Sequence, residues 1–127
     1  MLFRSTDASL VPGDIAAINA HAASTKIGDK VEHEALQAIF GNNLPPVSAN
    51  KSLIGHAMGA SSAIESIFAL QGMQESILPP TINYTADPDI DIDCVAEGKR
   101  SLEQEFVLKN SFGFGGCNAC AVFKKVS

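Results

Sequence analysis

The chain has 127 residues, a length at which one domain buries roughly two thirds of its unfolded surface and holds its own core. Hydrophobic residues make up 46% and charged residues 18%, which excludes a disordered chain, and no apolar run approaches the roughly 18 residues of a membrane span. The net charge of −5 argues against nucleic acid and anionic membranes as partners.

The N-terminal residues and the cysteines bear on the cellular compartment, and the N-terminal residues also suggest where the domain begins. The first residues, MLFRSTDASL, lack a signal-peptide apolar core, and the three cysteines are an odd number. We therefore expect free thiols in a reducing compartment, cytoplasmic or organellar. Residues 1–11 show neither a helix cap nor a clear strand, so we expect an N-terminal remnant without fixed structure, followed by one domain over residues 12–127.

The first half of the chain predicts a strand, a helix and a second strand. The apolar run Ile15–Asn19 is typical of a buried strand. Asp29 is placed like a helix N-cap, with Glu32 three residues on as in a capping box, and an apolar stripe then continues to Phe40. Val47–Asn50 is short and strand-like.

The second half predicts a helix and two strands. A helix from Ala57 to about Gly72 is apolar on most sides, so we expect it to be well buried. Pro79 and Pro80 then exclude helix, and residues 105–112 and 119–126 read as two strands around a glycine-rich loop. Strands alternating with helices indicate an α/β fold.

A histidine in a glycine-framed turn is the first candidate for chemistry. In KSLIGHAMGASSAIE, His56 lies between Gly55 and Gly59 and just ahead of the second helix. A neutral imidazole donates one hydrogen bond and accepts another, so it can polarise a carbonyl without carrying charge. The alternative is a structural histidine that caps the turn.

A second candidate cluster follows the first strand directly. Asn19, His21, Ser24 and Thr25 lie in NAHAAST, where that strand ends, and ligands of open α/β sheets bind at the carboxyl ends of strands. The alternative is an ordinary polar loop.

The loop NSFGFGGCN is the third candidate. Glycines around Phe112 and Phe114 allow unusual backbone angles, and such a loop can offer backbone N–H groups as an oxyanion hole. Cys117 and Cys120 have metal or redox spacing, but two further ligands are missing and an extended chain turns the two thiols to opposite sides. We therefore expect no metal site.

Together and in this order, these motifs resemble the C-terminal half of a β-ketoacyl-acyl carrier protein synthase of the elongating type. The stretches that carry the resemblance are NAHAASTKIGD, KSLIGHAMGASSAIE, LPPTIN and NSFGFGGCNA, within about Pro12 to Phe123. The resemblance implies a thiolase-like half: an α/β fold with a mixed β-sheet flanked by helices. It implies a decarboxylative Claisen condensation in fatty acid or polyketide synthesis.

The resemblance also assigns roles to residues. His21 and His56 match the two histidines that hold the malonyl thioester carbonyl and stabilise the enolate left by decarboxylation. Lys51 matches the family lysine beside the second histidine, and Glu65 matches the acidic residue with which that lysine works.

The implied substrate-binding residues lie in two loops. Thr25 matches a threonine that binds the pantetheine arm. Phe114 matches the residue that gates the acyl pocket and lends a backbone N–H, within the loop that also holds Phe112, Gly113 and Gly115. No cofactor is implied, since substrates are carried on the phosphopantetheine of acyl carrier protein.

Three positions depart from the family pattern. Ala23 stands where a second threonine is usual, Ala22 replaces a common glycine, and Cys117 replaces a common threonine. The nucleophilic cysteine of the family belongs to the N-terminal half, and no cysteine here lies in a strand-to-helix turn rich in small residues. We therefore expect the chain alone to be inactive.

The implied partners are acyl carrier protein and the N-terminal half of the synthase or a second subunit. A face that would normally pack against that half leads us to expect a homo-oligomer. The alternative function is a non-catalytic thiolase-like module for interaction or dimerisation.

The resemblance makes a geometric prediction. His21 and His56 should converge, with side-chain nitrogens within about 6–7 Å, because both must reach one thioester oxygen at roughly 3 Å. Phe114 should lie at the rim of the same cleft, and Lys51 should approach Glu65.

Overall fold

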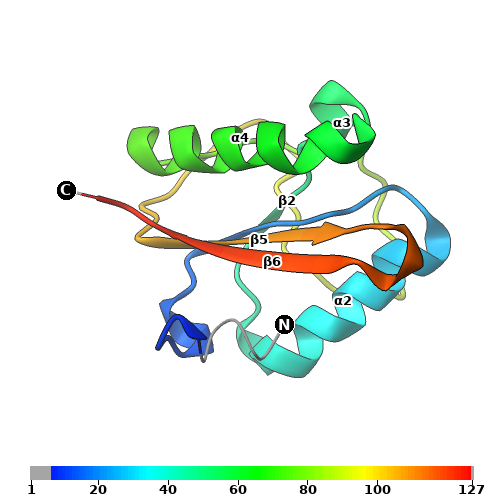
Figure 1. Ribbon diagram of the computed structural model, residues 1–127, viewed down its shortest axis with the longest axis horizontal. Coiled ribbons are helices and arrows are strands. Elements are labelled where there is room, and N and C mark those ends of the chain that lie inside the picture. The colour runs from blue at the N-terminus through cyan, green and yellow to red at the C-terminus, as the bar shows by residue number, and fades with distance from the viewer. Residues whose placement is uncertain (1–6, 127) are drawn as a thin grey trace.

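The computed structural model describes residues 7–126, and its central feature is a four-stranded sheet in the order β2-β1-β5-β6 (Figure 1). The strands are β1 (Ala17–Asn19), β2 (Val47–Ser48), β5 (Phe106–Phe112) and β6 (Asn118–Lys124). β1 runs parallel to β2 and β5, whereas β6 is antiparallel to β5, so the predicted mixed sheet is confirmed. Residues 1–6 of the expected N-terminal remnant lie outside the described residues, and that expectation stays a prediction.

Two long helices cover opposite faces of the sheet (Figure 1). α2 (Lys26–Phe40) connects β1 to β2, and α4 (Ser61–Glu75) lies on the other side. The predicted N-cap Asp29 is wrong, because α2 begins earlier and the Thr25 hydroxyl accepts the Gly28 N–H at 3.1 Å. Asp29 lies instead in the first turn, where the positive end of the helix favours an acidic side chain.

The predicted second helix is divided in the structure. A short helix, α3 (Lys51–Ile54), ends at Gly55, whose φ of 75° only glycine adopts readily. A 3-10 turn, Met58–Ala60, then leads into α4, so the continuous helix expected from Ala57 begins later and ends later.

The expected burial of α4 is only partly correct. Ile67 is 56% exposed and Leu70 is 43% exposed, whereas Glu65, Ala69 and Met73 are buried against the sheet. The face of α4 that points away from the sheet therefore exposes large apolar side chains among polar ones.

The core has two parts, one on each face of the sheet. Ile18 of β1 and Leu108 of β5 pack toward Leu36 of α2, whereas the neighbouring Ala17 and Val107 pack toward α4. This division follows from the alternation of side chains along a strand. Because both faces are covered by helices, the short parallel strands β1 and β2 are buried throughout.

The remaining elements are short. β3 (Ile77–Leu78) pairs antiparallel with β4 (Arg100–Ser101), and further 3-10 turns lie at Pro12–Asp14, Gly41–Asn43 and Phe114–Gly116. Within residues 7–126, none of the helices has both the length and the apolar character needed to cross a membrane.

Candidate active site

The candidate site is built on the carboxyl ends of β1 and β2. These strands are parallel neighbours, with Ile18 opposite Val47 and Asn19 opposite Ser48. The chain therefore leaves both strands at one edge of the sheet, where ligands bind in folds of this kind. His21 follows β1 by two residues, and Lys51 begins α3 shortly after β2.

The two candidate histidines converge, as predicted. The ring centroids of His21 and His56 lie 5.6 Å apart, with the ring planes at 80°. The ring of Phe112, at the end of β5, lies 5.4 Å from the His21 ring and adds an apolar wall. His21 is half-buried and His56 is exposed, so small molecules can reach the pair.

Hydrogen bonding determines which nitrogen of His56 carries the proton. The Met58 backbone N–H donates to His56 Nδ1 at 3.1 Å, and Ser61 Oγ lies at 3.1 Å from the same atom. A backbone N–H only donates, so Nδ1 must be the acceptor and the ring proton of the neutral imidazole lies on Nε2.

His21 is held in the same tautomer by a different group. Lys51 Nζ faces His21 Nδ1 at 3.5 Å and donates to the His21 carbonyl at 2.6 Å. An ammonium has only donors, so Nδ1 again presents its lone pair. Burial, followed by the charge of Lys51, lowers the pKa of His21, which keeps the ring neutral. The pair thus offers two Nε2–H donors.

A buried ion cluster lies behind the histidines. Glu65 Oε1 accepts from Lys51 at 2.6 Å, which confirms the predicted approach, and Glu65 Oε2 lies 2.7 Å from Lys109 Nζ. Burial lowers the pKa of Lys109, and the ion pair with Glu65 opposes this shift. The sequence reasoning missed Lys109, although a lysine in the middle of an apolar strand is a recognisable signal.

Glu32 is a second residue whose contacts in the site were not predicted from the sequence. It was predicted to belong to a capping box, but its side chain turns inward and accepts the backbone N–H groups of His21 and Ala22 at 2.9 and 2.8 Å. A glutamate on the buried face of an amphipathic helix was the available signal.

The predicted substrate-binding residues differ in how exposed they are and in which contacts they make. Thr25 is exposed near the site, and its hydroxyl oxygen is engaged in capping α2. Gly113 N–H donates to the Cys117 carbonyl at 2.8 Å, and Gly115 has a φ of 72°. The Phe114 side chain is 89% exposed, so its expected place at the rim of a cleft stays a prediction.

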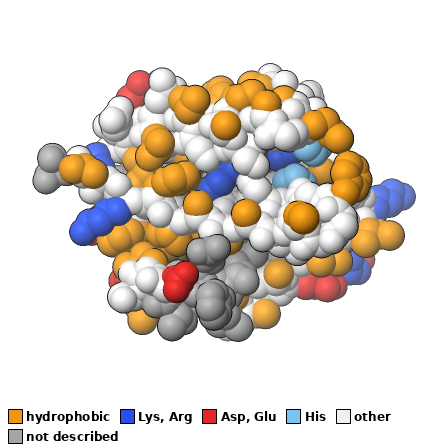
Figure 2. Space-filling model, viewed as in Figure 1, with side chains coloured by type: hydrophobic (Ala, Val, Ile, Leu, Met, Phe, Trp, Pro, Cys, Tyr) orange, Lys and Arg blue, Asp and Glu red, His pale blue; other side chains and the backbone are white. Residues whose placement is uncertain are grey.

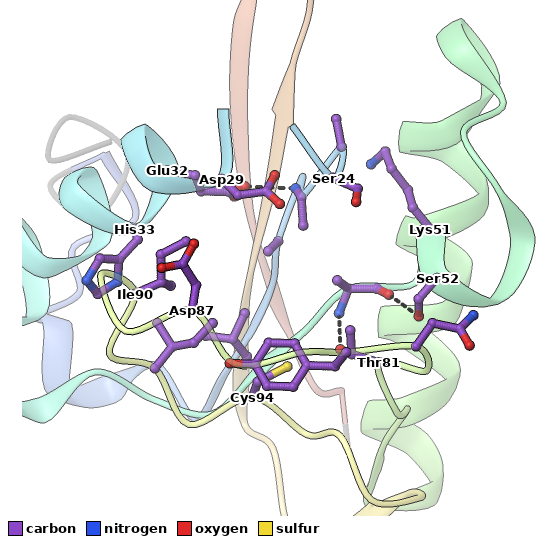
Figure 3. A pocket seen from close by; sticks show the side chains of 18 of the residues that line it. Ser24, Asp29, Glu32, His33, Lys51, Ser52, Thr81, Asp87, Ile90 and Cys94 are labelled. Atoms are coloured by element: carbon purple, nitrogen blue, oxygen red, sulfur yellow. Dashed lines mark hydrogen bonds between the residues drawn. The ribbon is translucent and has the colours of Figure 1, made fainter. Parts of the chain in front are cut away.

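A cavity of about 620 Å³ reaches the site, and His56 and Lys51 are among the residues that line it. Figure 3 shows Lys51 and Ser52 on one side, Glu32 and His33 of α2 on the other, and Cys94 near the base. Its wall near the site includes Ala23, the position where the resemblance predicts that a hydroxyl is absent.

The thiols and the acidic groups form no metal centre in the described part of the chain. Cys94, Cys117 and Cys120 form no disulfide, and no group of three or more His, Cys, Asp or Glu side chains within residues 7–126 could hold a metal ion.

Comparison with solved structures defines the class of the fold. The ishigamide ketosynthase/chain length factor superposes with a TM-score of 0.96 at 33% identity, over 99% of this chain and 32% of that one. A chain of the structure described as a type II PKS acyl-carrier protein in complex with its ketosynthase superposes with a TM-score of 0.93 at 33% identity. The match covers 97% of this chain and 31% of the other. The fold is therefore that of the thiolase-fold ketosynthases.

Sequence comparison then gives the family. Residues 4–85 match the family described as "Beta-ketoacyl synthase, C-terminal domain", so this chain belongs to the β-ketoacyl synthase family. It is 44% identical over 117 residues to 3-oxoacyl-(acyl-carrier-protein) synthase 2 of Mycobacterium bovis. That match covers 91% of this chain but only 28% of the relative, so the chain spans less than a third of the length of this relative.

Proposed function

We propose that this chain is the malonyl-binding part of a β-ketoacyl-acyl carrier protein synthase. The observation that carries the proposal is the convergence of His21 and His56, each with Nδ1 facing a donor and Nε2–H free to donate. Two such donors suit one thioester oxygen.

In the proposed reaction, the carbon–carbon bond to the malonyl carboxylate breaks and CO₂ leaves. The electron pair moves into the thioester as an enolate, whose oxygen accepts hydrogen bonds from His21 and His56. The enolate carbon then attacks an acyl-cysteine thioester, and the cysteine thiolate leaves. Donors aimed at charge that develops in the transition state are worth about 3–4 kcal/mol each.

The other residues act around this pair. Lys51, held by Glu65, supports the backbone and Nδ1 of His21. Thr25 binds the pantetheine arm, and the loop with Phe112, Gly113, Phe114 and Gly115 supplies a gate and an oxyanion site for the acyl thioester. Because Gly113 N–H already donates to the Cys117 carbonyl, the backbone donor that we propose in this loop is the N–H of Phe114.

The proposed partners are acyl carrier protein and a polypeptide segment or subunit that supplies the nucleophile. One structural neighbour is described as an acyl carrier protein in complex with its ketosynthase, which supports the first partner. None of the three cysteines of this chain precedes a helix: Cys94 makes an isolated bridge, Cys117 follows a 3-10 turn and Cys120 lies within β6. We therefore expect no condensation product from the chain alone.

A titration tests the histidine pair. The probe is malonyl-aza(dethia)-pantetheine, in which NH replaces the thioester sulfur, because the resulting amide stabilises an enolate poorly and resists decarboxylation. We expect H21A and H56A each to weaken binding at least about tenfold, or ~1.4 kcal/mol, because each removes one donor. E34A, which truncates an exposed side chain of α2 that does not line the cavity, is the control. Equal effects of all three substitutions would contradict the proposal.

A second candidate function is a non-catalytic module that binds a partner subunit. The exposed apolar face of α4, with Ile67 and Leu70, favours this alternative, as does the loss of a hydroxyl at Ala23. If the probe does not bind while the chain associates through α4, the module is the better description.

A further inference from the structure

The imidazole of His56 lies in a turn whose backbone is irregular and open to solvent. His56 is exposed, Gly55 before it has a φ of 75°, and Met58 after it has a φ of 48°, in the left-handed region that disfavours a side chain. The Met58 N–H donates to His56 Nδ1 at 3.1 Å, but Met58 belongs to the same turn and moves with it. This bond therefore selects the acceptor nitrogen, and it cannot by itself fix the ring relative to the sheet.

A buried serine connects this ring to a long helix. Ser61 is the first residue of α4 and is only 3% exposed, and its Oγ lies 3.1 Å from His56 Nδ1. Because Nδ1 carries a lone pair in this tautomer, the hydroxyl is the donor in the contact. The bond joins the ring to a helix of 15 residues that packs on the sheet through buried side chains such as Met73.

The same face of α4 holds the other histidine through an ion pair. Glu65 lies four residues after Ser61, which places these two buried side chains on one side of the helix. Glu65 Oε1 accepts from Lys51 Nζ at 2.6 Å, and Lys51 Nζ faces His21 Nδ1 at 3.5 Å. One turn of α4 therefore reaches both imidazoles, directly through Ser61 and indirectly through Glu65.

The relative direction of the two rings is what this arrangement can preserve. Their centroids lie 5.6 Å apart with the planes at 80°, and hydrogen bonds weaken steeply when donors are misdirected. A half-turn of the His56 ring about its Cβ–Cγ bond would put a carbon atom in the place of Nδ1. Both donors, the Met58 N–H and the Ser61 hydroxyl, would then lose their acceptor. The Ser61 contact therefore opposes that rotation.

We propose that Ser61 is a positioning residue for His56: its hydroxyl holds the imidazole against α4, the helix that also holds Lys51 and thereby His21. Ser61 is buried and acts through His56. The role of His56 itself rests on the proposed function.

The test compares S61A with S62A. Alanine is smaller than serine and favours helix more strongly, so we expect both variants to keep the fold. Ser62 is exposed and receives the Ser66 hydroxyl on its backbone carbonyl, so S62A removes a hydroxyl without touching the histidine. Ring ¹⁵N spectra, with His56 assigned through H56Q, are recorded about two pH units above the ordinary pKa of histidine, where imidazoles are neutral.

In wild type we expect well-separated Nδ1 and Nε2 signals for His56, because one tautomer is held. In S61A the ring should leave the turn for part of the time and populate the second tautomer, so the difference between the two ¹⁵N shifts should shrink. Mere loss of a donor beside a fixed ring would not shrink it, because an unbonded Nδ1 resonates further from the protonated nitrogen than a hydrogen-bonded one. S62A should match wild type.

Binding of malonyl-aza(dethia)-pantetheine gives the second readout. We expect S61A to bind about two- to tenfold more weakly than wild type, the range that corresponds to one hydrogen bond, and S62A to bind like wild type. An undiminished shift difference in S61A would overturn the proposal whatever the affinity, because the His56 ring would then be held without Ser61.

Two combinations of results separate this role from the proposed function. If the wild-type chain binds no probe while the shift difference shrinks in S61A, the proposed function fails and the positioning role stands. If the wild-type chain binds the probe and S61A matches it in both spectra and affinity, Ser61 has no such role and the proposed function stands.

Discussion

At the scale of single residues, the balance of buried charge governs the site. Two ammonium groups, Lys51 and Lys109, share the carboxylate of Glu65, and all three side chains are almost fully buried. His21 lies beside this excess of positive charge. Its pKa is lowered by burial and then by Lys51, while Glu32 and Glu65 oppose the shift. A neutral ring at this position is what a hydrogen-bond donor to a thioester oxygen requires.

Acid should destabilise the fold partly through His21. The unfolded residue binds a proton near its ordinary pKa of 6.5, but the folded residue binds one only at lower pH. As the pH falls through the pKa of the unfolded residue, the unfolded state therefore binds more protons than the folded state. The free energy of unfolding falls as the pH falls from about 7 to about 5. Urea unfolding across this range should show a smaller fall in H21Q than in wild type. Equal slopes in H21Q and wild type would refute the assignment.

The ion cluster predicts a strong difference between its members. E65Q leaves two buried ammonium groups without a carboxylate, so we expect it to lower the free energy of unfolding by about 3–5 kcal/mol. K109M should cost clearly less, because Glu65 keeps its 2.6 Å pair with Lys51. Urea unfolding of both variants measures the difference. A larger loss in K109M than in E65Q would show that Lys109, not Glu65, is the centre of the cluster.

At the scale of elements, α2 has two roles, one in the fold and one at the site. It is the crossover that makes β1 and β2 parallel, and its first residues border the site. Thr25 at its N-cap is the link, because the same hydroxyl that accepts the Gly28 N–H still has a proton to donate to a ligand. The proposed contact with the pantetheine arm and the capping contact are therefore compatible.

Substitution of Thr25 separates these tasks. T25A should lower the free energy of unfolding by about 1 kcal/mol, because the Gly28 N–H loses its cap, and it should also weaken probe binding. T25S keeps the hydroxyl and should retain most of both properties. If T25A binds the probe as tightly as wild type while it loses stability, Thr25 is a cap and no more.

At the scale of the whole molecule, one apolar face is left open. Figure 2 shows hydrophobic side chains along the upper edge of the molecule, where α4 lies. Ile67 and Leu70 of α4 are about half exposed, and Met58 nearby is 59% exposed. Large contiguous apolar patches are uncommon on monomers and usually mark an interface.

Association should therefore depend on α4. We expect I67E to reduce self-association in sedimentation velocity experiments over a wide concentration range, because it places a charge in the open face. V31E is the matched control, since Val31 is 55% exposed but lies on α2, on the opposite face of the sheet. A wild-type chain that stays monomeric throughout, or equal effects of the two variants, would contradict an interface at α4.

Much of this architecture was readable from local signals. The strand around Ile18, the end of α2 at Phe40 and the two strands after Glu105 follow from apolar periodicity and turn residues, which act over a few neighbours. Gly55 and the glycine-rich loop were visible as breaks. The four-residue α3 and the start of α2 could not be predicted in this way. For α2, the two candidate N-caps Thr25 and Asp29 differ only in their tertiary contacts.

The residues that bear chemistry divide in the same way. His21, Lys51, His56 and Glu65 were identified by motif, since their types and spacing are properties of the chain itself. Only the folded structure showed that Lys109 and Lys51 both pair with Glu65. It also showed that Glu32 accepts hydrogen bonds from the loop of His21 and from Asn110, which lies 78 residues from Glu32 in the sequence. The direction of a buried polar side chain depends on which distant donors the topology brings within about 3 Å, and no local pattern carries that information.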